Sequence, residues 1–454
     1  MFKIPLVKNN QKLQKIHKNL VVNTKNILKK RKILRFFVAQ ILTTYCQGVK
    51  IRLVYKRRNT MEKRKTVYLD NAATTQISSE AYREMIDAYG NLYGNSSSLY
   101  TLGRNADFAL EQAREKVAKA IGAEPNEIYF TSGGTEADNW AIKGLAHANR
   151  EKGNHIITSV IEHPAVLESC RALEKEGYRV TYVPVDENGI VKYAEIIKAM
   201  GPDTILISIM TANNEVGTIE PIRAIAELAR ANDVIFHTDA VQAIGAVEMN
   251  VKEMKIDAMS ISGHKIYGPK GTGALYVRKG VKIDRLIDGG AQERGLRAGT
   301  LNVPAFVGFG KAIEKATENV EENNKYLKSV RRYFLKSLSE RVHNISLNGH
   351  PTQRLAGNAS VSFEGVEGES LLMLLDREGI SVSTGSACAS GSLEPSHVLM
   401  AMGKDEDARS TIRFSFGLNN TKEDVDYVVG RLQKVVKKLR SISAVRIYKN
   451  KVEL

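Results

Sequence analysis

Short apolar segments alternate with helical patterns along the middle of this chain, and this alternation restricts the possible fold more than any other feature. Segments typical of strands lie at 127–130, 155–160, 204–210, 234–237, 258–261 and 273–277. Helical patterns lie between several of them, at 136–148, 165–176 and 221–231. Nearly continuous apolar strands separated by helices are typical of a parallel sheet that is covered on both faces. We therefore predict an α/β fold.

The pattern changes after about residue 304, which indicates a second and smaller domain. A long, charged helical pattern covers 313–338, and strand-like and helical segments follow at 359–363, 369–378, 411–416 and 422–439. Such a mixture is typical of an α+β domain, and a chain of this length can support more than one core. We predict a large domain over 76–319 and a small domain formed by 61–75 together with 320–454.

Basic residues are concentrated at the N-terminus. The protein has 454 residues, with 66 Lys+Arg, 50 Asp+Glu and a formal net charge of +16. Residues 1–60 contain sixteen of the basic residues and no acidic residue, so residues 61–454 are neutral overall. Charge therefore gives no reason to interpret the whole molecule as a nucleic-acid-binding protein, and we expect no stable complex with nucleic acid.

The basic extension at 1–60 has three possible explanations. We favour a start codon assigned too early, because the charge balance changes at Met61; a targeting segment and a nucleic-acid-binding arm are the alternatives. The longest apolar stretch, at 33–45, falls short of the roughly 18–20 residues that span a bilayer, so we expect no membrane association. The three cysteines are a low, odd number, which suits a reducing compartment. We predict a cytoplasmic location, or a mitochondrial or related organellar one if the extension is a true presequence.

Polar residues gather directly after the predicted strands. They occupy the segments 131–135, 162–163, 212–215, 238–242 and 262–265. In an open α/β sheet, ligands bind beyond the carboxyl ends of the strands. We therefore expect these segments to form one site.

The segment Ser132-Gly133-Gly134-Thr135 lies between a predicted strand and a predicted helix. Its glycines let the backbone approach an anion, and the start of the helix offers free N–H groups and the positive end of a dipole. The segment therefore suits a phosphate group. Capping of the helix by the side chain of Thr131 or Ser132 is the alternative interpretation.

Lys265 and Asp239 follow neighbouring strands of the predicted sheet. A turn-rich stretch after Lys265 could enclose its amine and lower its pKa from roughly 10.4, as a lysine that forms a Schiff base requires. Ser262 and His264 could bind a phosphate beside it. Asp239 could cap a helix, or it could keep the pyridine nitrogen of a cofactor protonated. An anion-binding loop, one lysine and one aspartate at neighbouring strand ends are what pyridoxal 5′-phosphate requires.

Seven motifs occur in order within residues 66–440. They are YLDNAATT at 68–75, TSGGTE at 131–136, NNEVG at 213–217, HTDAVQ at 237–242, SGHK at 262–265, ER with RAGT at 293–300, and GSAC at 385–388. On these motifs the chain resembles the cysteine desulfurases, which are pyridoxal-phosphate enzymes of the class V aminotransferase group. The resemblance implies the fold of a fold type I pyridoxal-phosphate-dependent transferase, with a mostly parallel sheet in the large domain and a smaller α+β C-terminal domain.

The resemblance also implies a role for each cofactor-binding residue. Lys265 would hold the cofactor covalently, Asp239 would pair with its pyridine nitrogen and Gln242 with its phenolic oxygen. His163 would stack on the ring and assist proton transfer, so that Lys265, His163 and Cys388 would be the catalytic residues. The phosphate would be bound by Gly134, Thr135, Ser262 and His264, with Thr300 supplied by a second subunit.

Substrate binding and sulfur transfer are implied for a further set of residues. Asn71 and Asn214 would lie close to the substrate, and the planar guanidinium of Arg413 would bind its carboxylate. Cys388 lies in a stretch of small residues at 384–392 without helical or strand periodicity, and we expect it to be the nucleophile that accepts sulfur. Cys170 has apolar neighbours at helical spacing, so we assign it to the core.

The predicted reaction converts L-cysteine to L-alanine and leaves a persulfide on Cys388 for a sulfur acceptor, such as an iron–sulfur scaffold or a thiolation enzyme. Expected partners are L-cysteine, a second copy of the chain and that acceptor, with no metal ligand apart from a transient contact of Cys388 with a nascent cluster. The alternatives are a selenocysteine lyase or another β-elimination on the same cofactor, and more distantly a nucleic-acid-binding role for residues 1–60. A scaffold that has lost the cofactor is a further alternative.

Overall fold

The structure is a computed structural model that describes residues 65–385, 395–443 and 452–453. The chain divides into two units, Met1–Lys63 and Arg64–Leu454, and every structural statement concerns the second unit. The basic extension and the predicted nucleophile Cys388 therefore lie outside the described residues. No helix in the described part is both long and apolar enough to cross a membrane.

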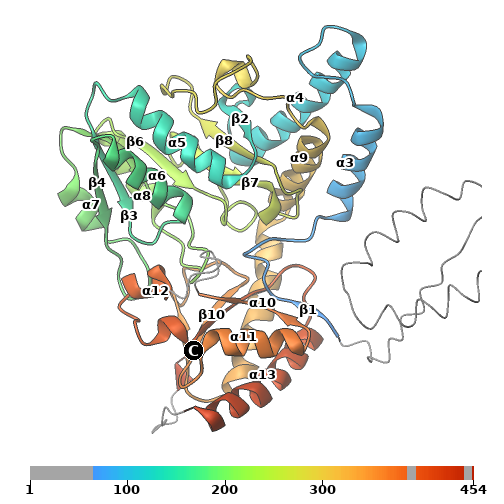
Figure 1. The fold of residues 1–454 in the computed structure, drawn as a ribbon, viewed down its shortest axis with the longest axis vertical. Coiled ribbons are helices and arrows are strands. Elements are labelled where there is room, and N and C mark those ends of the chain that lie inside the picture. The colour runs from blue at the N-terminus through green and yellow to red at the C-terminus, as the bar shows by residue number, and fades with distance from the viewer. Residues whose placement is uncertain (1–64, 386–394, 444–451, 454) are drawn as a thin grey trace, which may run out of the picture. The chain divides into compact units, whose positions relative to one another are not determined.

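A seven-stranded sheet forms the centre of the larger part of the fold (Figure 1). In spatial order its strands are β2 (Ile128–Thr131), β8 (Gly273–Val277), β7 (Ala258–Ser262), β6 (Ile235–Asp239), β5 (Thr204–Ser208), β3 (His155–Ser159) and β4 (Arg179–Val183). Neighbours from β7 to β4 are parallel, whereas β8 is antiparallel to both β7 and β2. The mostly parallel sheet confirms the predicted fold class, and the bounds of the predicted strands shift by two residues at most.

Helices cover both faces of this sheet because both sides of its strands are apolar. On one face Ile156 and Leu206 pack with α5 (Gly134–Ala148) and α6 (Pro164–Lys175). On the other face the next residues along the same strands, Ile157 and Ile207, share a cluster with helices packed on that side. These helices are α4 (Thr101–Ile121), α7 (Tyr193–Ala199), α8 (Ile222–Ala231) and α9 (Val303–Glu318). Alternate strand residues therefore stabilise opposite layers.

A separate hydrophobic cluster joins the two ends of the described chain. Val67 and Leu69, near its start, pack with residues between Val330 and Val436. The elements of this part are β1 (Val67–Tyr68), α10 (Val320–Ser339), β9 (Ile345–Asn348), β10 (Asn358–Phe363), α11 (Gly368–Arg377), β11 (Ile380–Ser381), β12 (Ser383–Thr384), β13 (Thr411–Ser415), α13 (Lys422–Ile442) and β14 (Val452–Glu453). They form a five-stranded sheet in the order β12-β13-β10-β9-β14 and a β1-β11 pair. The domain division stays a prediction, and Val398 and Leu399, which we assigned to the small domain, pack in the cluster of the larger part.

The single long helix predicted over 313–338 is wrong. The structure instead has two helices, α9 and α10, which are separated at Asn319 by a non-helical backbone conformation of φ −135° and ψ 42°. Ile313 in α9 packs in the large-domain cluster, whereas Val330 and Phe334 in α10 belong to the cluster of the small domain. The break lets one continuous helical pattern serve two separate cores.

Several shorter elements complete the fold. The helix α3 (Ser79–Asn91) packs against α9, and α12 (His397–Ala401) follows the undescribed residues 386–394. Turns of 3₁₀ helix occur at η1 (Pro125–Glu127), η2 (Gly263–Lys265), η3 (Glu293–Gly295) and η4 (Asp407–Arg409). Thr384, which we expected to lie in an irregular stretch, instead ends the strand β12 and pairs with Ile412.

Candidate active site

The predicted site residues follow strands that end at the same edge of the seven-stranded sheet. Asp239 is the last residue of β6 and pairs with Ser260 of the parallel strand β7. Ser262 ends β7 and faces Gly273, which also faces Thr131 at the end of β2. The strand register therefore brings the ends of β2, β6 and β7 together, as the rule for open α/β sheets predicts.

The start of α5 offers backbone N–H groups that no side chain caps. Its N-cap is Gly133, whose φ of 155° is a conformation that favours glycine, and it makes no side-chain cap hydrogen bond. The capping alternative is therefore wrong, because the Thr131 hydroxyl donates to the Gly133 carbonyl at 3.1 Å and accepts no helix N–H at this N-cap. A Cβ atom added to Gly134 would lie 3.5 Å from the Ser262 Cβ atom. The open helix start and Ser262 thus form one cradle that suits a phosphate group.

Lys265 and Gln242 both face the backbone of the segment after β1. Lys265 Nζ donates to the carbonyl oxygens of Ala72 at 2.6 Å and Ala73 at 2.7 Å. Gln242 Nε2 donates to the Ala72 oxygen at 2.9 Å. His264, beside the lysine, contacts the Thr74 hydroxyl through Nδ1 at 3.1 Å. The structure therefore brings the predicted covalent attachment point close to the residue predicted to bind the phenolic oxygen.

Asp239 and His163 interact electrostatically with Lys265. Burial raises the pKa of Asp239, whereas His163 and Lys265 act to lower it. Burial also lowers the pKa of His163, which favours the neutral imidazole. His163 is the N-cap of α6, and its Nδ1 accepts a hydrogen bond from Ala165 N at 3.1 Å. In the neutral ring the proton therefore lies on Nε2.

Arg413 on β13 is buried, with 1% of its surface exposed. Its Nη1 donates to the Asn214 carbonyl at 2.9 Å, and its Nη2 pairs with Asp70 Oδ1 at 2.9 Å. Its Nε is a buried donor without a hydrogen-bond partner among the described residues. Asn71, predicted to bind substrate, donates from Nδ2 to the Ser415 oxygen at 2.8 Å. A fixed guanidinium with an unused donor is suited to a carboxylate ligand.

Sequence reasoning did not anticipate the ion pair between Asp70 and Arg413. The two residues are 343 positions apart, and only the presence of Asp70 in the YLDNAATT motif could have drawn attention to it. Thr300 is exposed in the segment between η3 and α9, and its role toward a second subunit stays a prediction. Cys388 lies outside the described residues, whereas Cys170 is buried and burial raises its pKa to about 12.

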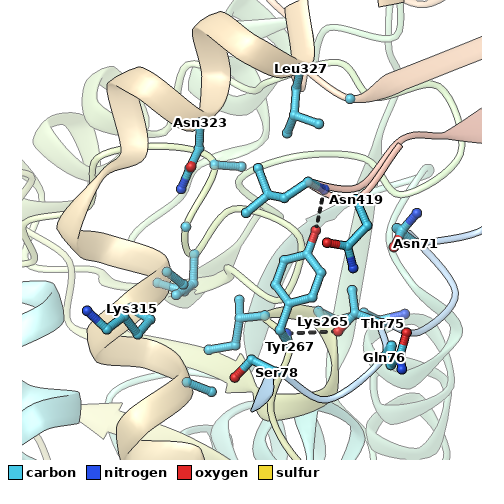
Figure 2. Close-up of a pocket in the computed structure, with 18 of the residues that line it drawn as sticks. Asn71, Thr75, Gln76, Ser78, Lys265, Tyr267, Lys315, Asn323, Leu327 and Asn419 are labelled. Carbon is cyan, nitrogen blue, oxygen red and sulfur yellow. Dashed lines mark hydrogen bonds between the residues drawn. The ribbon is translucent and has the colours of Figure 1, made fainter. Parts of the chain in front are cut away.

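Lys265 is also one of the residues that line a cavity of about 770 Å³. Figure 2 shows Tyr267 within it, between the helical segment that carries Lys315 and the segment that carries Thr75. Among the predicted site residues that the structure describes, only Asn71, Gln242 and Lys265 line this cavity. His163, Asp239 and Arg413 do not line it, so the cavity is separate from most of the predicted cofactor-binding residues.

The residues of the sheet edge fit pyridoxal 5′-phosphate. The uncapped start of α5 matches the phosphate, the buried Asp239 matches the pyridine nitrogen, and Lys265 matches the aldehyde. The buried, unpartnered Nε of Arg413 matches the carboxylate of an amino-acid substrate. Each of these groups has the charge or hydrogen-bonding capacity opposite to that of the group it would meet.

The chain is similar to known proteins over most of its length. The family model described as aminotransferase class-V matches residues 67–428. The cysteine desulfurase IscS of Methanosarcina thermophila is 56% identical over 386 residues, which are 85% of this chain and 95% of that protein. A solved structure described as a NifS-like protein superposes with a TM-score of 0.78 at 41% identity, covering 82% of this chain and 100% of that one. A structure of SspA in complex with cysteine gives a TM-score of 0.69 at 38% identity, with 77% and 99% covered. The chain therefore belongs to the class V aminotransferase family and, within it, to the cysteine desulfurases.

Proposed function

We propose that this enzyme converts L-cysteine to L-alanine and carries the released sulfur as a persulfide on Cys388. The observation that supports this most is the convergence of the uncapped α5 start, Asp239 and Lys265 at one sheet edge. The enzyme depends on pyridoxal 5′-phosphate, and its relatives include the IscS protein and a SspA structure with bound cysteine.

The chain's own residues would hold the cofactor from several directions. The N–H groups of Gly134 and Thr135, with the side chains of Ser262 and His264, would bind its phosphate. Asp239 would face the pyridine nitrogen. When bound, the cofactor withdraws electrons from the α-carbon of the amino acid and so weakens the bonds to it.

Substrate orientation and proton transfer are assigned to three other residues. Arg413 would bind the cysteine carboxylate through its unpartnered Nε, because the Asp70 and Asn214 contacts fix the guanidinium in place. The amine of Lys265 would take the α-proton. His163 would assist proton transfer through Nε2, since its Nδ1 is occupied by the Ala165 amide.

The sulfur step is a displacement at the substrate sulfur. The Cys388 thiolate attacks that sulfur and forms an S–S bond, while the Cβ–S bond of the substrate breaks and its electron pair goes to Cβ. Protonation of Cβ yields alanine, so one cysteine and one enzyme thiol become one alanine and one enzyme persulfide. No external oxidant or reductant is consumed. The persulfide sulfur then passes to an acceptor protein, for which we propose an iron–sulfur scaffold or a thiolation enzyme.

A second copy of the chain is the partner that best explains an exposed apolar surface on α3 and α4. This surface consists of Tyr82, Ile86, Tyr89, Tyr93, Leu99, Tyr100, Leu102 and Phe108, which are 40–89% exposed. Tyr93, Leu99 and Tyr100 lie in the segment between the two helices, and large exposed apolar side chains on successive elements are grounds to propose an interaction site. We propose a cytoplasmic homodimer that uses this surface. Analytical ultracentrifugation should give a dimer mass, and Ile86→Glu combined with Phe108→Glu should shift it toward the monomer; a monomeric wild type would contradict the proposal.

The decisive experiment is single-turnover incubation of the cofactor-loaded enzyme with L-cysteine. Alanine is quantified, and the modified residue is identified by mass spectrometry. Wild type and the control Cys170→Ala should both place the added sulfur on the peptide that contains Cys388. Cys388→Ala should keep the absorbance of the bound cofactor but form no persulfide.

Two outcomes would contradict the proposal. One is sulfur recovered only as free sulfide from wild type; the other is equal alanine release with and without the Cys388 thiol. Selenocysteine is tested in parallel. If alanine forms from selenocysteine but not from cysteine, and forms equally in Cys388→Ala, the enzyme is a selenocysteine lyase.

A further inference from the structure

Glu215 is a buried carboxyl group to which the proposed mechanism assigns no role. It lies in the loop after β5 and is 3% exposed. Its N–H donates to Asn213 Oδ1 at 2.8 Å, and its carbonyl accepts from Asn358 Nδ2 at 3.2 Å. These contacts hold the backbone of Glu215 from both sides.

The two ends of the segment that carries Cys388 meet at this carboxyl group. Ser396, which is 1% exposed, donates from Oγ to Glu215 Oε2. A Cβ atom added to Gly385 would lie 3.4 Å from the Ser396 Cβ atom and 3.7 Å from Glu215 Oε2. Residues 385 and 396 lie on either side of the undescribed residues 386–394 in the sequence. These distances show that the two residues are also neighbours in space.

This meeting point lies beside the substrate-binding groups. Glu215 follows Asn214, whose carbonyl accepts from Arg413, and Arg413 acts on the pKa of the Glu215 carboxyl. The next residue after Ser396, His397, contacts the Glu162 carbonyl through Nε2 at 3.1 Å. The flank after Cys388 is thus joined to the loop after β5 and to the loop after β3 that leads to His163.

We propose that Glu215 is a positioning residue, which holds Ser396 against Gly385 and so fixes both ends of the Cys388 segment beside Arg413. The inference rests on the proposed function, because it assigns a purpose to this contact only if Cys388 accepts sulfur. Fixed ends limit the orientations in which the Cys388 thiol reaches the substrate. A small misplacement of a reacting group greatly lowers the rate of the chemical step. Loop length itself matters little, since closure entropy changes slowly with the number of residues.

The test compares Glu215→Ala, Glu215→Gln and a matched control in the cofactor-loaded, full-length enzyme. The control is Glu220→Ala, because Glu220 is an equally buried carboxyl in the same loop whose Oε2 accepts from Val191 N at 2.8 Å instead. Single-turnover persulfide formation on Cys388 should fall by roughly 10–100-fold in Glu215→Ala. Glu215→Gln keeps an acceptor for Ser396 and should stay within about threefold of wild type.

Two further measurements separate positioning from general destabilisation. The change in cofactor absorbance on addition of cysteine, which reports substrate binding, should keep its half-saturation in Glu215→Ala. Hydrogen exchange of the peptide that contains 396–401 should accelerate in Glu215→Ala but not in Glu220→Ala. Ser396→Ala should slow persulfide formation less in the Glu215→Ala background than in wild type, because the Ser396–Glu215 contact is already lost there and only the Leu399 N–H bond to Ser396 Oγ remains to be removed.

The outcomes distinguish this inference from the proposed function. If wild type forms no persulfide on Cys388, the proposed function fails. If wild type forms it and Glu215→Ala does so at the same rate, the positioning role is refuted while the function stands. An equal loss in Glu220→Ala would also refute it, because the effect would then come from loosening the loop as a whole.

Discussion

Removal of the Glu293 carboxylate is expected to destabilise the enzyme more than any ordinary surface change. Glu293 accepts from Arg114 Nη1 and Nη2 at 2.8 Å each, and from Phe130 N at 2.7 Å. The side chain of Arg114 is 3% exposed and that of Glu293 is 0% exposed. Glu293→Ala would remove the buried counter-charge of Arg114 and leave it only the half-exposed Glu111, and breaking a buried pair costs about 3–5 kcal/mol.

The backbone at this position adds to the argument. Glu293 and Arg294 have φ values of 44° and 57°, in the left-handed region that residues other than glycine rarely adopt. Such conformations persist only where the surrounding structure holds them. The contacts of Glu293 with Arg114 and Phe130 tie η3 to α4 and β2, and β2 leads into the phosphate cradle. The same carboxylate therefore supports both the fold and the cradle.

The magnitude can be measured as a shift in the unfolding midpoint. For a folding unit of about 390 residues, the unfolding entropy is roughly 0.8 kcal/mol per kelvin, so a loss of about 4 kcal/mol lowers Tm by about 5 K. Differential scanning calorimetry of Glu293→Ala measures this shift. The control is Glu111→Ala, because Glu111 pairs with the same Arg114 at 2.9 Å but is 47% exposed, and an exposed pair contributes about 0.2–1 kcal/mol.

A second variant tests the cause of the loss. Arg114→Met combined with Glu293→Gln removes both charges and keeps an acceptor for Phe130 N, so it should be more stable than Glu293→Ala. Equal Tm shifts in Glu293→Ala and Glu111→Ala would refute the reasoning. A double variant less stable than Glu293→Ala would show that the uncompensated charge is not the source of the loss.

Three further results are expected. N-ethylmaleimide at neutral pH should leave Cys170 unmodified in the native enzyme. Burial raises the pKa of Cys170 to about 12, which lowers its thiolate fraction roughly 3,000-fold below that of an ordinary thiol. Modified Cys170 found by peptide mass spectrometry in enzyme that has not unfolded would contradict this. Lys265→Ala should lose the absorbance of the covalently held cofactor and the formation of alanine, and turnover at the wild-type rate would exclude its assigned role. Burial raises the pKa of Glu162 to about 8, so this group stabilises the fold at acidic pH and loses that contribution as the pH rises from about 4.5 to 8, by up to about 1.4 kcal/mol per pH unit. The Tm of Glu162→Gln relative to wild type should therefore rise from pH 5 to pH 8, and a fall would contradict the assignment.

The positions of the strands and of the residues that follow them could be predicted, because both follow from local patterns. A run such as 204–210 is apolar on both sides, and its end therefore places the next polar residues at the sheet edge. The helices α3 and α4 received no such prediction. The buried side of α4 includes Leu110, Val117 and Ile121, but the apolar pattern is interrupted because Arg114 is buried and the large residue Phe108 is exposed.

Contacts between distant parts of the chain could not be predicted from the sequence. Arg413 and Asp70 are 343 positions apart, and Ser396 and Glu215 are 181 positions apart. Neither pair has a periodicity or spacing that would connect its members. The Asp70–Arg413 pair depends on how the two ends of the small domain come together, and the Ser396–Glu215 pair depends on how that domain packs on the sheet edge. The resemblance to a family suggested a role for Arg413 but none for Glu215, which became visible only through the contacts of its side chain.

The distribution of charge at the sheet edge explains how several buried carboxyl groups can coexist there. Burial and the charge of Asp239 both raise the pKa of Asp138 and of Glu162. His163 and Lys265 act in the opposite direction on Asp239 itself. Like charges in a buried site do not all ionise readily, and the pKa directions favour the anion on Asp239, where His163 and Lys265 oppose the effect of burial. Asp138 Oδ1 and Glu162 Oε2 have no hydrogen-bond partner among the described residues, and such atoms cost far less in a neutral acid than in an anion. This balance favours a negative charge at the strand end where we propose that the pyridine nitrogen of the cofactor binds.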